Sequence, residues 1–324
     1  MPQLAPGCRG TTLAYLPRMA AQPSYEPDLL PARDAAVVFN LRSRRGRDLA
    51  RPALEALRRH GLLIKEAHFA RSGPEMMKAA RQAVESGAGT IVVGGGDGTI
   101  SSVVNLLARR RDLVLGILPV GTGNEVARIL GIPLDLDGAC RVIAEGRPEA
   151  VDLVEANGRY FLHTGLIGYP AKVNHSIPPW LKARFGKVAY TLSLLRAMLG
   201  ARPFHARVTG GGLAWEGETV AVIAGNGRFH LPAHVLLPRR GGREPGLVVY
   251  TPRGSQLSTI FRLAVGLWIT RARQPDLLFA IRGDSVTVEA SPPQDLDLDG
   301  EYARQTPVHF QLARAALRVL VPAQ

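Results

Sequence analysis

The chain has 324 residues, which is long enough for a buried core and for two domains. Hydrophobic residues make up 46% and charged residues 21% of it, a composition typical of globular proteins. Its 40 lysines and arginines against 27 aspartates and glutamates give a net charge of +13. This charge favours an anionic partner, which a nucleotide, a nucleic acid or an acidic membrane surface would provide. The most apolar helical segment, 257–270, is interrupted by Arg262, so no transmembrane helix is expected.

The first 34 residues predict a loose tail. They contain prolines at positions 2, 6, 17, 23, 27 and 31 and lack the apolar core of a signal peptide. The two cysteines, Cys8 and Cys140, lie far apart, which predicts neither a disulfide nor a metal–thiolate site. We therefore expect a cytoplasmic protein.

Residues 35–150 alternate between strand-like and helix-like patterns. Apolar runs predict strands at 35–39, from 62, at 90–93 and at 114–118. Periodic apolar positions predict helices at 48–60, 74–85, 100–107 and 126–130, and from Asp137 as N-cap to Gly146. This alternation predicts an α/β domain with a doubly wound parallel sheet covered on both faces.

Residues 151–324 predict a second, β-rich domain. Helices are expected at about 179–200 and 255–273. The expected strands are 151–156, 160–166, 205–209, 219–224, 247–250, 285–289, 308–312 and 317–321.

Two glycine turns each follow a predicted strand. The first, GGGDGT at residues 94–99, lies between an apolar strand and a helix, so bare backbone amides and the positive end of the helix dipole would form an anion cradle. A tight turn without a ligand is the alternative. The second, PVGTGNE at residues 119–125, has the same setting. Consecutive right-handed crossovers would place both turns at one carboxyl edge, where they could line one phosphate-binding crevice.

These two stretches, GGGDGTISSVVNLL and LGILPVGTGNEVARILGIP, resemble the diacylglycerol kinase, sphingosine kinase and bacterial lipid kinase superfamily. The fold of that family is shared more distantly with NAD kinases and phosphofructokinases. The resemblance covers about residues 35–322. It implies a nucleotide-binding domain, a lipid-binding β-sandwich-like domain and an active site between them.

The resemblance also implies a set of nucleotide-binding residues. They are Asn40, Ser43, Gly95, Gly96, Asp97, Gly98, Thr99, Gly121, Thr122 and Asn124. The chain departs from the family pattern at four nearby positions: Leu41 replaces proline, Arg44 replaces glycine, Ser102 replaces glutamate and Glu125 replaces aspartate. No Walker lysine motif is present, so ATP would be held by the glycine turns.

A catalytic base is implied near the C-terminus. The sequence LDLDGE at 296–301 resembles the family's Leu-Asp-Gly-Glu signature, in which the aspartate is the proposed proton acceptor. That role maps onto Asp299, with Glu301 as the second choice, while Asp97 is a third catalytic candidate that acts on metal or nucleotide. The alternative is that Asp295, Asp297 and Asp299 alternate outward from a strand and are solvated. A calcium loop is disfavoured because Thr306 occupies its twelfth position.

No structural metal site is predicted in the second domain. The family has an Asp-Gly pair that binds magnesium where this chain has Glu244-Pro245-Gly246. Basic and aromatic residues at 180–190 predict a helix that docks at an anionic interface.

The sequence thus predicts an ATP-dependent lipid kinase that uses Mg²⁺ and acts peripherally at a membrane. The acceptor candidates are diacylglycerol, a sphingoid base, ceramide and phosphatidylglycerol. A soluble NAD kinase and a non-catalytic nucleotide- or lipid-binding regulator remain open alternatives. A second copy of the chain, as a homodimer, is counted among the candidate partners. Nucleic-acid binding is disfavoured because no recognised module is present.

Overall fold

The computed structural model describes residues 13–14, 34–168, 202–229, 246–253 and 278–323. The chain forms two compact units. One, the α/β unit, comprises Met19–Leu153, Tyr160–Leu162 and Ala313–Gln324. The other, the β unit, comprises Met1–Arg18, Val154–Arg159 and His163–Leu312. The chain therefore passes between the units several times along its length.

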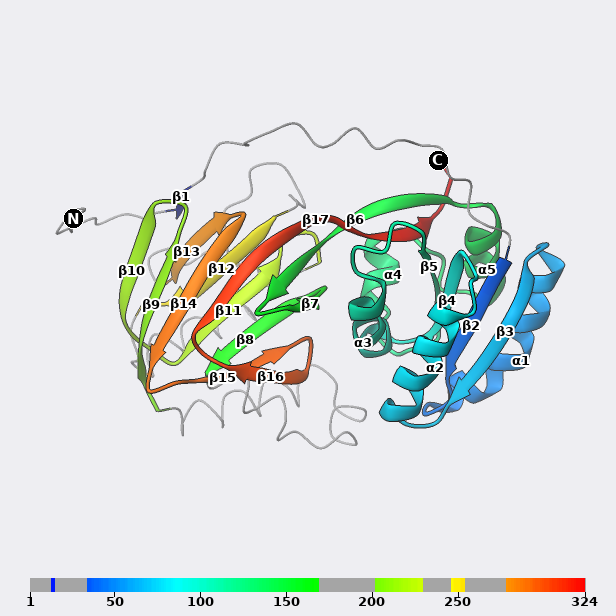
Figure 1. The fold of residues 1–324 in the computed structure, drawn as a ribbon, viewed down its shortest axis with the longest axis horizontal. Helices are drawn as coiled ribbons and strands as arrows, with labels where there is room; N and C mark the ends of the chain where they lie inside the picture. The colour runs from blue at the N-terminus through cyan, green and yellow to red at the C-terminus, as the bar shows by residue number, and fades with distance from the viewer. Residues whose placement is uncertain (1–12, 15–33, 169–201, 230–245, 254–277, 324) are drawn as a thin grey trace, which may run out of the picture. The chain divides into compact units, whose positions relative to one another are not determined.

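The α/β unit is built on a parallel sheet in the order β3-β2-β4-β5 (Figure 1). Its strands are β2 (Asp34–Asn40), β3 (Leu63–Ala70), β4 (Thr90–Gly95) and β5 (Val114–Pro119). Every residue of β4 and β5 is buried, as expected for strands covered on both faces. The end of β17 (Val308–Val321) joins the sheet beside β5.

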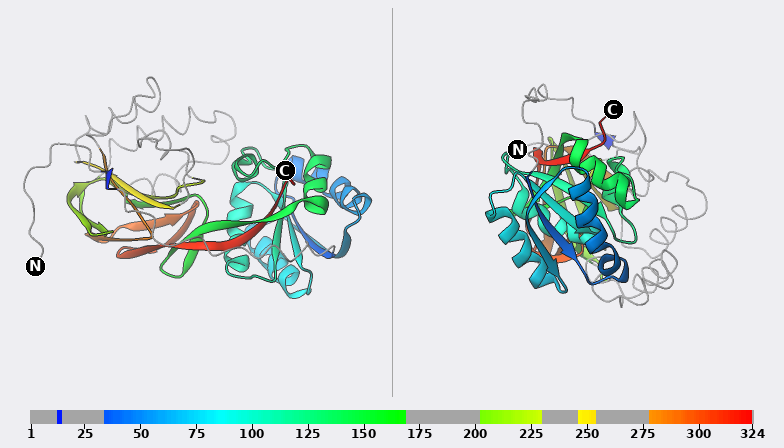
Figure 2. Two further views of the ribbon diagram at one scale, coloured as in Figure 1. Left: turned by 90° about the horizontal axis from the view of Figure 1, so that it is seen from above. Right: turned by 90° about the vertical axis from the view of Figure 1, so that its right-hand side faces the viewer.

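Two helical layers cover this sheet (Figure 2). In one layer α1 (Arg44–Arg59) packs against α5 (Leu136–Glu145), and in the other α2 (Gly73–Glu85) packs against α3 (Asp97–Leu107). A short helix, α4 (Glu125–Ile129), follows β5. The prediction of an N-terminal doubly wound parallel sheet is therefore confirmed.

Three predicted helix starts were wrong. Helix α3 begins at Asp97, directly after its N-cap Gly96, rather than at residue 100. Helix α1 begins at Arg44 rather than Asp48, because the Ser43 hydroxyl accepts a hydrogen bond from the Gly46 amide at 2.9 Å. Helix α5 is capped by Asp135, whose carboxylate accepts from the Gly138 amide at 2.7 Å. Asp137, the predicted cap, lies in the first turn instead.

The β unit contains two sheets. One holds β9 (Phe204–Gly210), β10 (Leu213–Thr219), β14 (Ser285–Ser291) and the start of β17. The other has the order β1-β13-β12-β11-β8-β15-β16. Its strands are β1 (Leu13–Ala14), β8 (Thr164–Gly168), β11 (Ala221–Asn226), β12 (Leu247–Pro252), β13 (Leu278–Gly283), β15 (Asp295–Leu298) and β16 (Glu301–Gln305).

The two sheets pack on each other as in a sandwich. Trp215 of β10 stacks on Phe279 of β13 with 6.0 Å between ring centroids. A Cβ on Gly168 of β8 would lie 2.5 Å from the ring of Phe204 in β9, so glycine allows this close approach. Pairing is antiparallel except for β1, which lies parallel to β13. The prediction of a β-sandwich-like C-terminal domain is confirmed by these two packed sheets.

Several strand predictions needed correction. The strands predicted at 308–312 and 317–321 are one strand, β17, which continues through Ala315 because the Ala315 amide donates to Asp152 on β6 (Arg147–Ala156). The strand predicted at 160–166 is two, β7 (Arg159–Phe161) and β8. Strands β1, β10, β13 and β16 were not predicted, and a strand at the position of β15 was considered only as the alternative for the three aspartates. The helices predicted at 179–200 and 255–273, and with them the basic and aromatic positions 180–190, lie outside the described residues.

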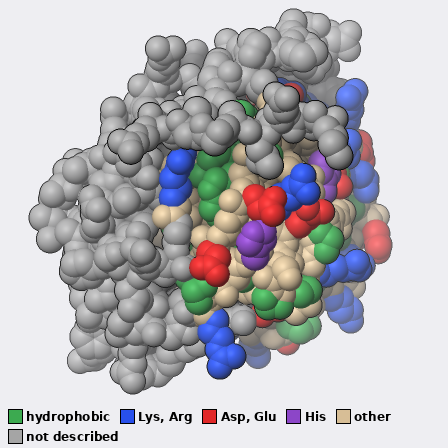
Figure 3. Space-filling view, turned by 90° about the vertical axis from the view of Figure 1, so that its left-hand side faces the viewer, with side chains coloured by type: hydrophobic (Ala, Val, Ile, Leu, Met, Phe, Trp, Pro, Cys, Tyr) green, Lys and Arg blue, Asp and Glu red, His purple; other side chains and the backbone are tan. Residues whose placement is uncertain are grey.

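One surface of the β unit carries charges of both signs. Glu216 of β10 lies 3.6 Å from His205 and 4.0 Å from Arg207, both on β9. Figure 3 views the side on which β9 and β10 lie in Figure 1, and shows acidic, basic and histidine side chains intermixed. Exposed pairs of this kind contribute little to stability. Among the described residues, no helix is both long and apolar enough to cross a membrane.

Candidate phosphate-binding loops and acidic turn

The carboxyl edge of the parallel sheet holds the predicted nucleotide residues. The chain leaves β2 toward β3 on one side and returns to β4 on the other, so a topological switch point lies between β2 and β4. Open α/β sheets bind ligands at such points, outside the carboxyl ends of the strands. Asn40 ends β2 and Gly95 ends β4, and Asn40 Nδ2 donates to Thr99 Oγ1 across the switch point at 2.8 Å.

The two glycine turns touch each other at this edge. A Cβ on Gly121 would lie 2.3 Å from the Cα of Gly96, and a Cβ on Gly96 would lie 3.1 Å from the Cα of Gly121. Asp97 Oδ1 also accepts from the Val126 amide at 3.0 Å, which ties the first turn to helix α4. The structure therefore brings the two turns together, as the sequence predicts.

The first turn presents backbone amides at the start of a helix. Gly96 is the N-cap of α3 and contributes no side-chain cap, while its carbonyl accepts from the Thr99 amide at 2.9 Å. Within the described residues the amides of Asp97 and Gly98 have no hydrogen-bond partner. Amides at the N-terminus of an eleven-residue helix are suited to bind an anion.

The second turn is braced by a buried side chain. Asn124, 5% exposed, accepts from the Gly121 amide at 2.9 Å and donates to the carbonyls of Pro119 at 3.1 Å and Gly121 at 2.9 Å. Its backbone is left-handed, with φ of 50°. The side-chain amide of Asn124 thus stabilises the conformation of its own loop. The next residues toward the N-terminus, Thr122 and Gly123, are exposed.

Asn40 and Ser43 also have structural contacts. Asn40 Oδ1 accepts from the Arg42 amide at 3.0 Å, and Ser43 caps α1. Leu41 and Arg44, where the family has proline and glycine, lie between β2 and α1 or at the helix start. These hydrogen bonds keep the β2–α1 turn in place without the proline.

Asp299 lies in a two-residue hairpin turn between β15 and β16. Asp299 and Gly300 both have positive φ, 52° and 95°, which is the conformation of the Asp-Gly type I′ turn. Asp299 Oδ1 accepts from the amides of His163 at 2.9 Å and Thr164 at 2.8 Å. This carboxylate is therefore fixed by backbone donors that lie before and at the start of β8.

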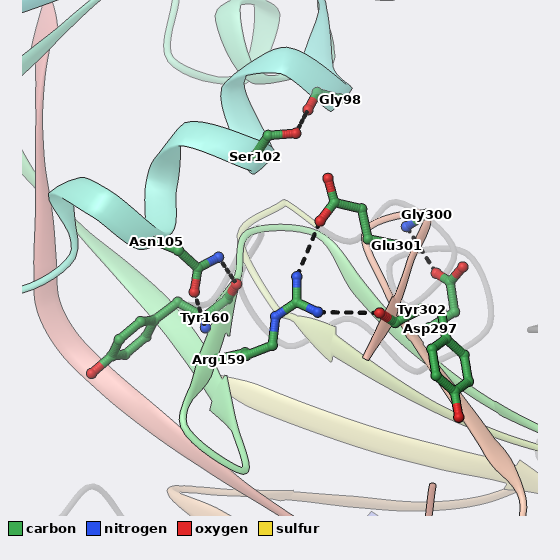
Figure 4. A network of polar contacts seen from close by, with 9 residues as sticks. All are labelled: Gly98, Ser102, Asn105, Arg159, Tyr160, Asp297, Gly300, Glu301 and Tyr302. Atoms are coloured by element: carbon green, nitrogen blue, oxygen red, sulfur yellow. Dashed lines mark hydrogen bonds and ion pairs between the residues drawn. The ribbon is translucent and has the colours of Figure 1, made fainter. Parts of the chain in front are cut away.

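The two acidic residues near Asp299, which are Asp297 and Glu301, make different contacts (Figure 4). Asp297 is 1% exposed and accepts from the Gly300 amide at 2.8 Å, so the alternative of three solvated aspartates is wrong at this position. Glu301 is exposed and pairs with Arg159 Nη2 at 3.0 Å. Arg159 Nη1 also donates to the Tyr302 carbonyl at 3.2 Å. Glu301 thus faces a cation, whereas Asp299 faces amides.

Other described groups offer little chemistry. No cluster of three or more histidine, cysteine, aspartate or glutamate side chains that could hold a metal ion occurs among the described residues. Cys140 is buried, and burial raises the pKa of its thiol to about 12, which disfavours a thiolate nucleophile.

The predicted site residues divide between the units. All the nucleotide-binding candidates, with Asp97, belong to the α/β unit, and Asp299 and Glu301 belong to the β unit. Sequence reasoning treated Asp297 only as a solvated residue, although it accepts a hydrogen bond within the acidic turn. It passed over Arg159, which donates to that hairpin, and Asn105, which binds the backbone of Tyr160. The signal for Asn105 was a single amide inside the apolar run VVNLL.

Known proteins resemble this chain over most of its length. Residues 34–156 match the diacylglycerol kinase catalytic domain. A Pseudomonas aeruginosa protein named "Probable lipid kinase YegS-like" is 35% identical over 256 residues, covering 76% of this chain and 81% of that protein. A Salmonella arizonae protein named "Probable lipid kinase YegS" is 28% identical over 295 residues, covering 89% and 96%.

A solved structure shows the same fold along nearly the whole chain. The crystal structure of a diacylglycerol kinase from Bacillus anthracis aligns with a TM-score of 0.66 and 25% identity, covering 90% of this chain and 97% of that one. The likeness therefore extends beyond the matched domain into the β unit. On the identity, the coverage and the matched domain together, the chain belongs to the lipid kinase family that shares the diacylglycerol kinase catalytic domain.

Proposed function

We propose that this protein is an ATP-dependent kinase that transfers the γ-phosphate to a lipid hydroxyl. The observation that carries the proposal is the contact of two strand–glycine–helix turns at the switch point of a parallel sheet, in a lipid kinase family member. Phosphoryl transfer depends mainly on positioning and on stabilising negative charge, which backbone amides at such an edge supply.

In the proposed reaction the amides of Asp97 and Gly98 bind phosphate oxygens of ATP. The acceptor hydroxyl oxygen attacks the γ-phosphorus, the bond to the bridging oxygen breaks, and ADP leaves. Asp299 receives the hydroxyl proton. Its Oδ1 atom, fixed by two amides, gives the carboxylate one orientation for this task.

The Asp97 carboxylate fits a metal that arrives with the nucleotide. Mg²⁺ is commonly bound through one or two carboxylates together with substrate phosphates, so a single aspartate suffices. A Cβ at Gly123 would lie 3.0 Å from Asp97 Oδ2, so glycine keeps that oxygen approachable. Bound there, Mg²⁺ would neutralise phosphate charge.

The test is phosphate transfer from labelled ATP to lipids in mixed micelles. The acceptor panel contains diacylglycerol, a sphingoid base, ceramide and phosphatidylglycerol, with NAD in detergent-free buffer as a separate acceptor. We expect one lipid to be phosphorylated. Transfer to NAD alone would identify a NAD kinase, and ATP binding without any transfer would identify a regulator.

The Asp299→Asn variant tests the base. Asparagine tolerates the positive φ and keeps an oxygen for the two amides, so the turn should persist. We expect kcat to fall by about 10²–10⁴-fold. Asp295→Asn is the matched control, because Asp295 lies on the same hairpin and its carboxylate accepts one hydrogen bond among the described residues, from the side chain of Gln305. Undiminished turnover in Asp299→Asn would remove the assignment of the base.

A further inference from the structure

A side-chain amide on α3 pairs with the backbone of β7. Asn105 Nδ2 donates to the Tyr160 carbonyl at 2.8 Å, and Asn105 Oδ1 accepts from the Tyr160 amide at 2.8 Å (Figure 4). Asn105 therefore replaces the hydrogen bonds that a neighbouring strand would make. Asn105 and Tyr160 both belong to the α/β unit and are only partly exposed, so loss of either bond would leave a partly desolvated group without a partner.

The side chain of Tyr160 is held by a different residue. Arg109 Nε donates to the Tyr160 hydroxyl at 2.6 Å, and the guanidinium lies 5.8 Å from the ring centroid. This contact is exposed. The side chain and the backbone of Tyr160 can therefore be perturbed separately.

The peptide held by Asn105 leads directly to the acidic turn. Phe161 and Leu162 are buried, at 0% and 1% exposure, and the next two amides, of His163 and Thr164, bind Asp299 Oδ1. The chain passes from the α/β unit to the β unit between Leu162 and His163. From Tyr160 to His163 it spans only three residues, about 10 Å when fully extended.

Helix α3, which carries Asn105, begins at the first glycine turn. Asn105 lies near the end of α3, and the same helix begins at Asp97, directly after Gly96. A helix transmits a displacement of one end to the other because its backbone hydrogen bonds keep its length fixed. An unbroken series of short links thus runs from the phosphate-binding turn through Asn105 and Tyr160 to the amides that hold Asp299.

We propose that Asn105 is a positioning residue for phosphoryl transfer, which couples the Asp299 turn to the helix that begins at the first glycine turn. The inference rests on the proposed function, in which Asp299 takes the proton of the acceptor. Asn105 itself touches neither ATP nor lipid in this scheme. It acts by fixing segment 159–164, whose amides orient the base.

The chain offers a matched control in Asn157. Asn157 Nδ2 donates to the Pro307 carbonyl at 3.0 Å, and its Oδ1 accepts from the His309 amide at 3.0 Å, so it makes the same two-way pairing. Asn157 has a φ of 49°, which aspartate tolerates. Asn105→Asp and Asn157→Asp each remove one amide donor and place a carboxylate beside a carbonyl oxygen.

We expect Asn105→Asp to lower kcat by at least about tenfold with KM for ATP changed by less than about twofold, because the phosphate-binding amides are untouched. Asn157→Asp should leave kcat within about twofold of the wild-type value. It should lower the melting temperature about as much as Asn105→Asp does. If Asn105→Asp does not fold, Asn105→Ala replaces it, with Asn157→Gly as the control suited to a positive φ.

Hydrogen exchange gives a readout that is independent of activity. The amides of His163 and Thr164 should exchange faster in the Asn105 variant and at the wild-type rate in the Asn157 variant. Equal kinetic effects of the two variants, or unchanged exchange at these amides, would overturn the coupling. Failure of wild-type protein to phosphorylate any lipid would instead refute the proposed function, while exchange would still decide the coupling.

Discussion

The two glycine turns of the α/β unit have the same position in their strand–helix units but different internal structures. The first ends β4 and opens directly into the eleven-residue helix α3, with no side chain capping the helix. The second ends β5 and leads into a five-residue helix, and the Asn124 side chain occupies its interior. Similar sequence signatures thus produce one open loop and one braced loop.

This difference separates the roles of the loops. The open loop offers the amides of Asp97 and Gly98 and a longer helix dipole. The braced loop packs its Gly121 against Gly96 and donates its Val126 amide to Asp97. We infer that the first turn binds phosphate and that the second holds the first in shape.

The largest effect is expected from Gly121→Ala. The added Cβ would lie 2.3 Å from the Cα of Gly96, so the two backbones must move apart. We expect a loss of about 2–3 kcal/mol in the free energy of unfolding and about a tenfold weaker affinity for ATP. Chemical denaturation and calorimetric titration measure these quantities.

Gly98→Ala is the control for this change. A Cβ at Gly98 has nothing within 4 Å and its φ is not in the left-handed region, so stability should change by less than about 0.5 kcal/mol. Equal stability of the two variants would show that the second loop does not support the first.

A smaller effect is expected when the brace alone is removed. Asn124→Ala would eliminate three hydrogen bonds to the loop backbone and place alanine at a φ of 50°. We expect a loss of about 2 kcal/mol, together with weaker ATP binding. Thr122→Ala, at an exposed position of the same loop, should change stability by less than about 0.5 kcal/mol. Wild-type ATP affinity in Asn124→Ala would contradict a bracing role.

Two substitutions of Asp97 separate the effect of its negative charge from the effect of its hydrogen bond with the Val126 amide. Asp97→Asn keeps an oxygen for the Val126 amide, so stability should change by less than about 0.5 kcal/mol, while turnover falls because the charge is lost. Asp97→Ala also breaks the contact and should cost about 1 kcal/mol more. Full turnover in Asp97→Asn with reduced turnover in Asp97→Ala would mean that Asp97 only connects the loops.

The glycine turns could be predicted from the sequence because their cause is local. Glycines between an apolar run and a helical pattern specify a strand–turn–helix unit, and adjacency of parallel strands follows from right-handed crossovers. The helix starts were less certain because Ser43 and Asp135 compete with nearby Asp48 and Asp137, and only the hydrogen bonds formed reveal the cap.

Other features depend on contacts distant in sequence. Asn105 and Tyr160 are 55 positions apart, and no periodicity shows which helix face meets which strand. Asp297 is buried on β15, which lies between β8 and β16, whereas its alternation with Asp295 and Asp299 suggested a solvated strand face. Register and neighbouring strands, which decide burial, have no local signature.

The smallest effect is expected from a substitution at the opposite edge of the same sheet, which also serves as a control for the two loops. Asp34, at the amino end of β2, pairs with Lys65 of β3, and Asp34 Oδ1 accepts from the Gly89 amide at 3.2 Å. The bond from Lys65 is the main cause that lowers the pKa of Asp34 below its ordinary value of 3.8. The stabilising effect of the ionised Asp34 carboxylate is therefore complete above pH of about 4 and is lost as pH falls through the lowered pKa.

Asp34→Asn should reduce the free energy of unfolding by only about 0.5–1 kcal/mol at pH 7, since both partners are partly exposed and screened by solvent. The difference from wild type should stay constant between about pH 5 and 7 and shrink toward zero below about pH 3. ATP affinity should be unchanged, because this edge lacks the loops. A loss of ATP affinity in Asp34→Asn would mean that damage anywhere in the sheet reaches the first glycine turn. The effects of Gly121→Ala and Asn124→Ala could then no longer be assigned to contact between the two loops.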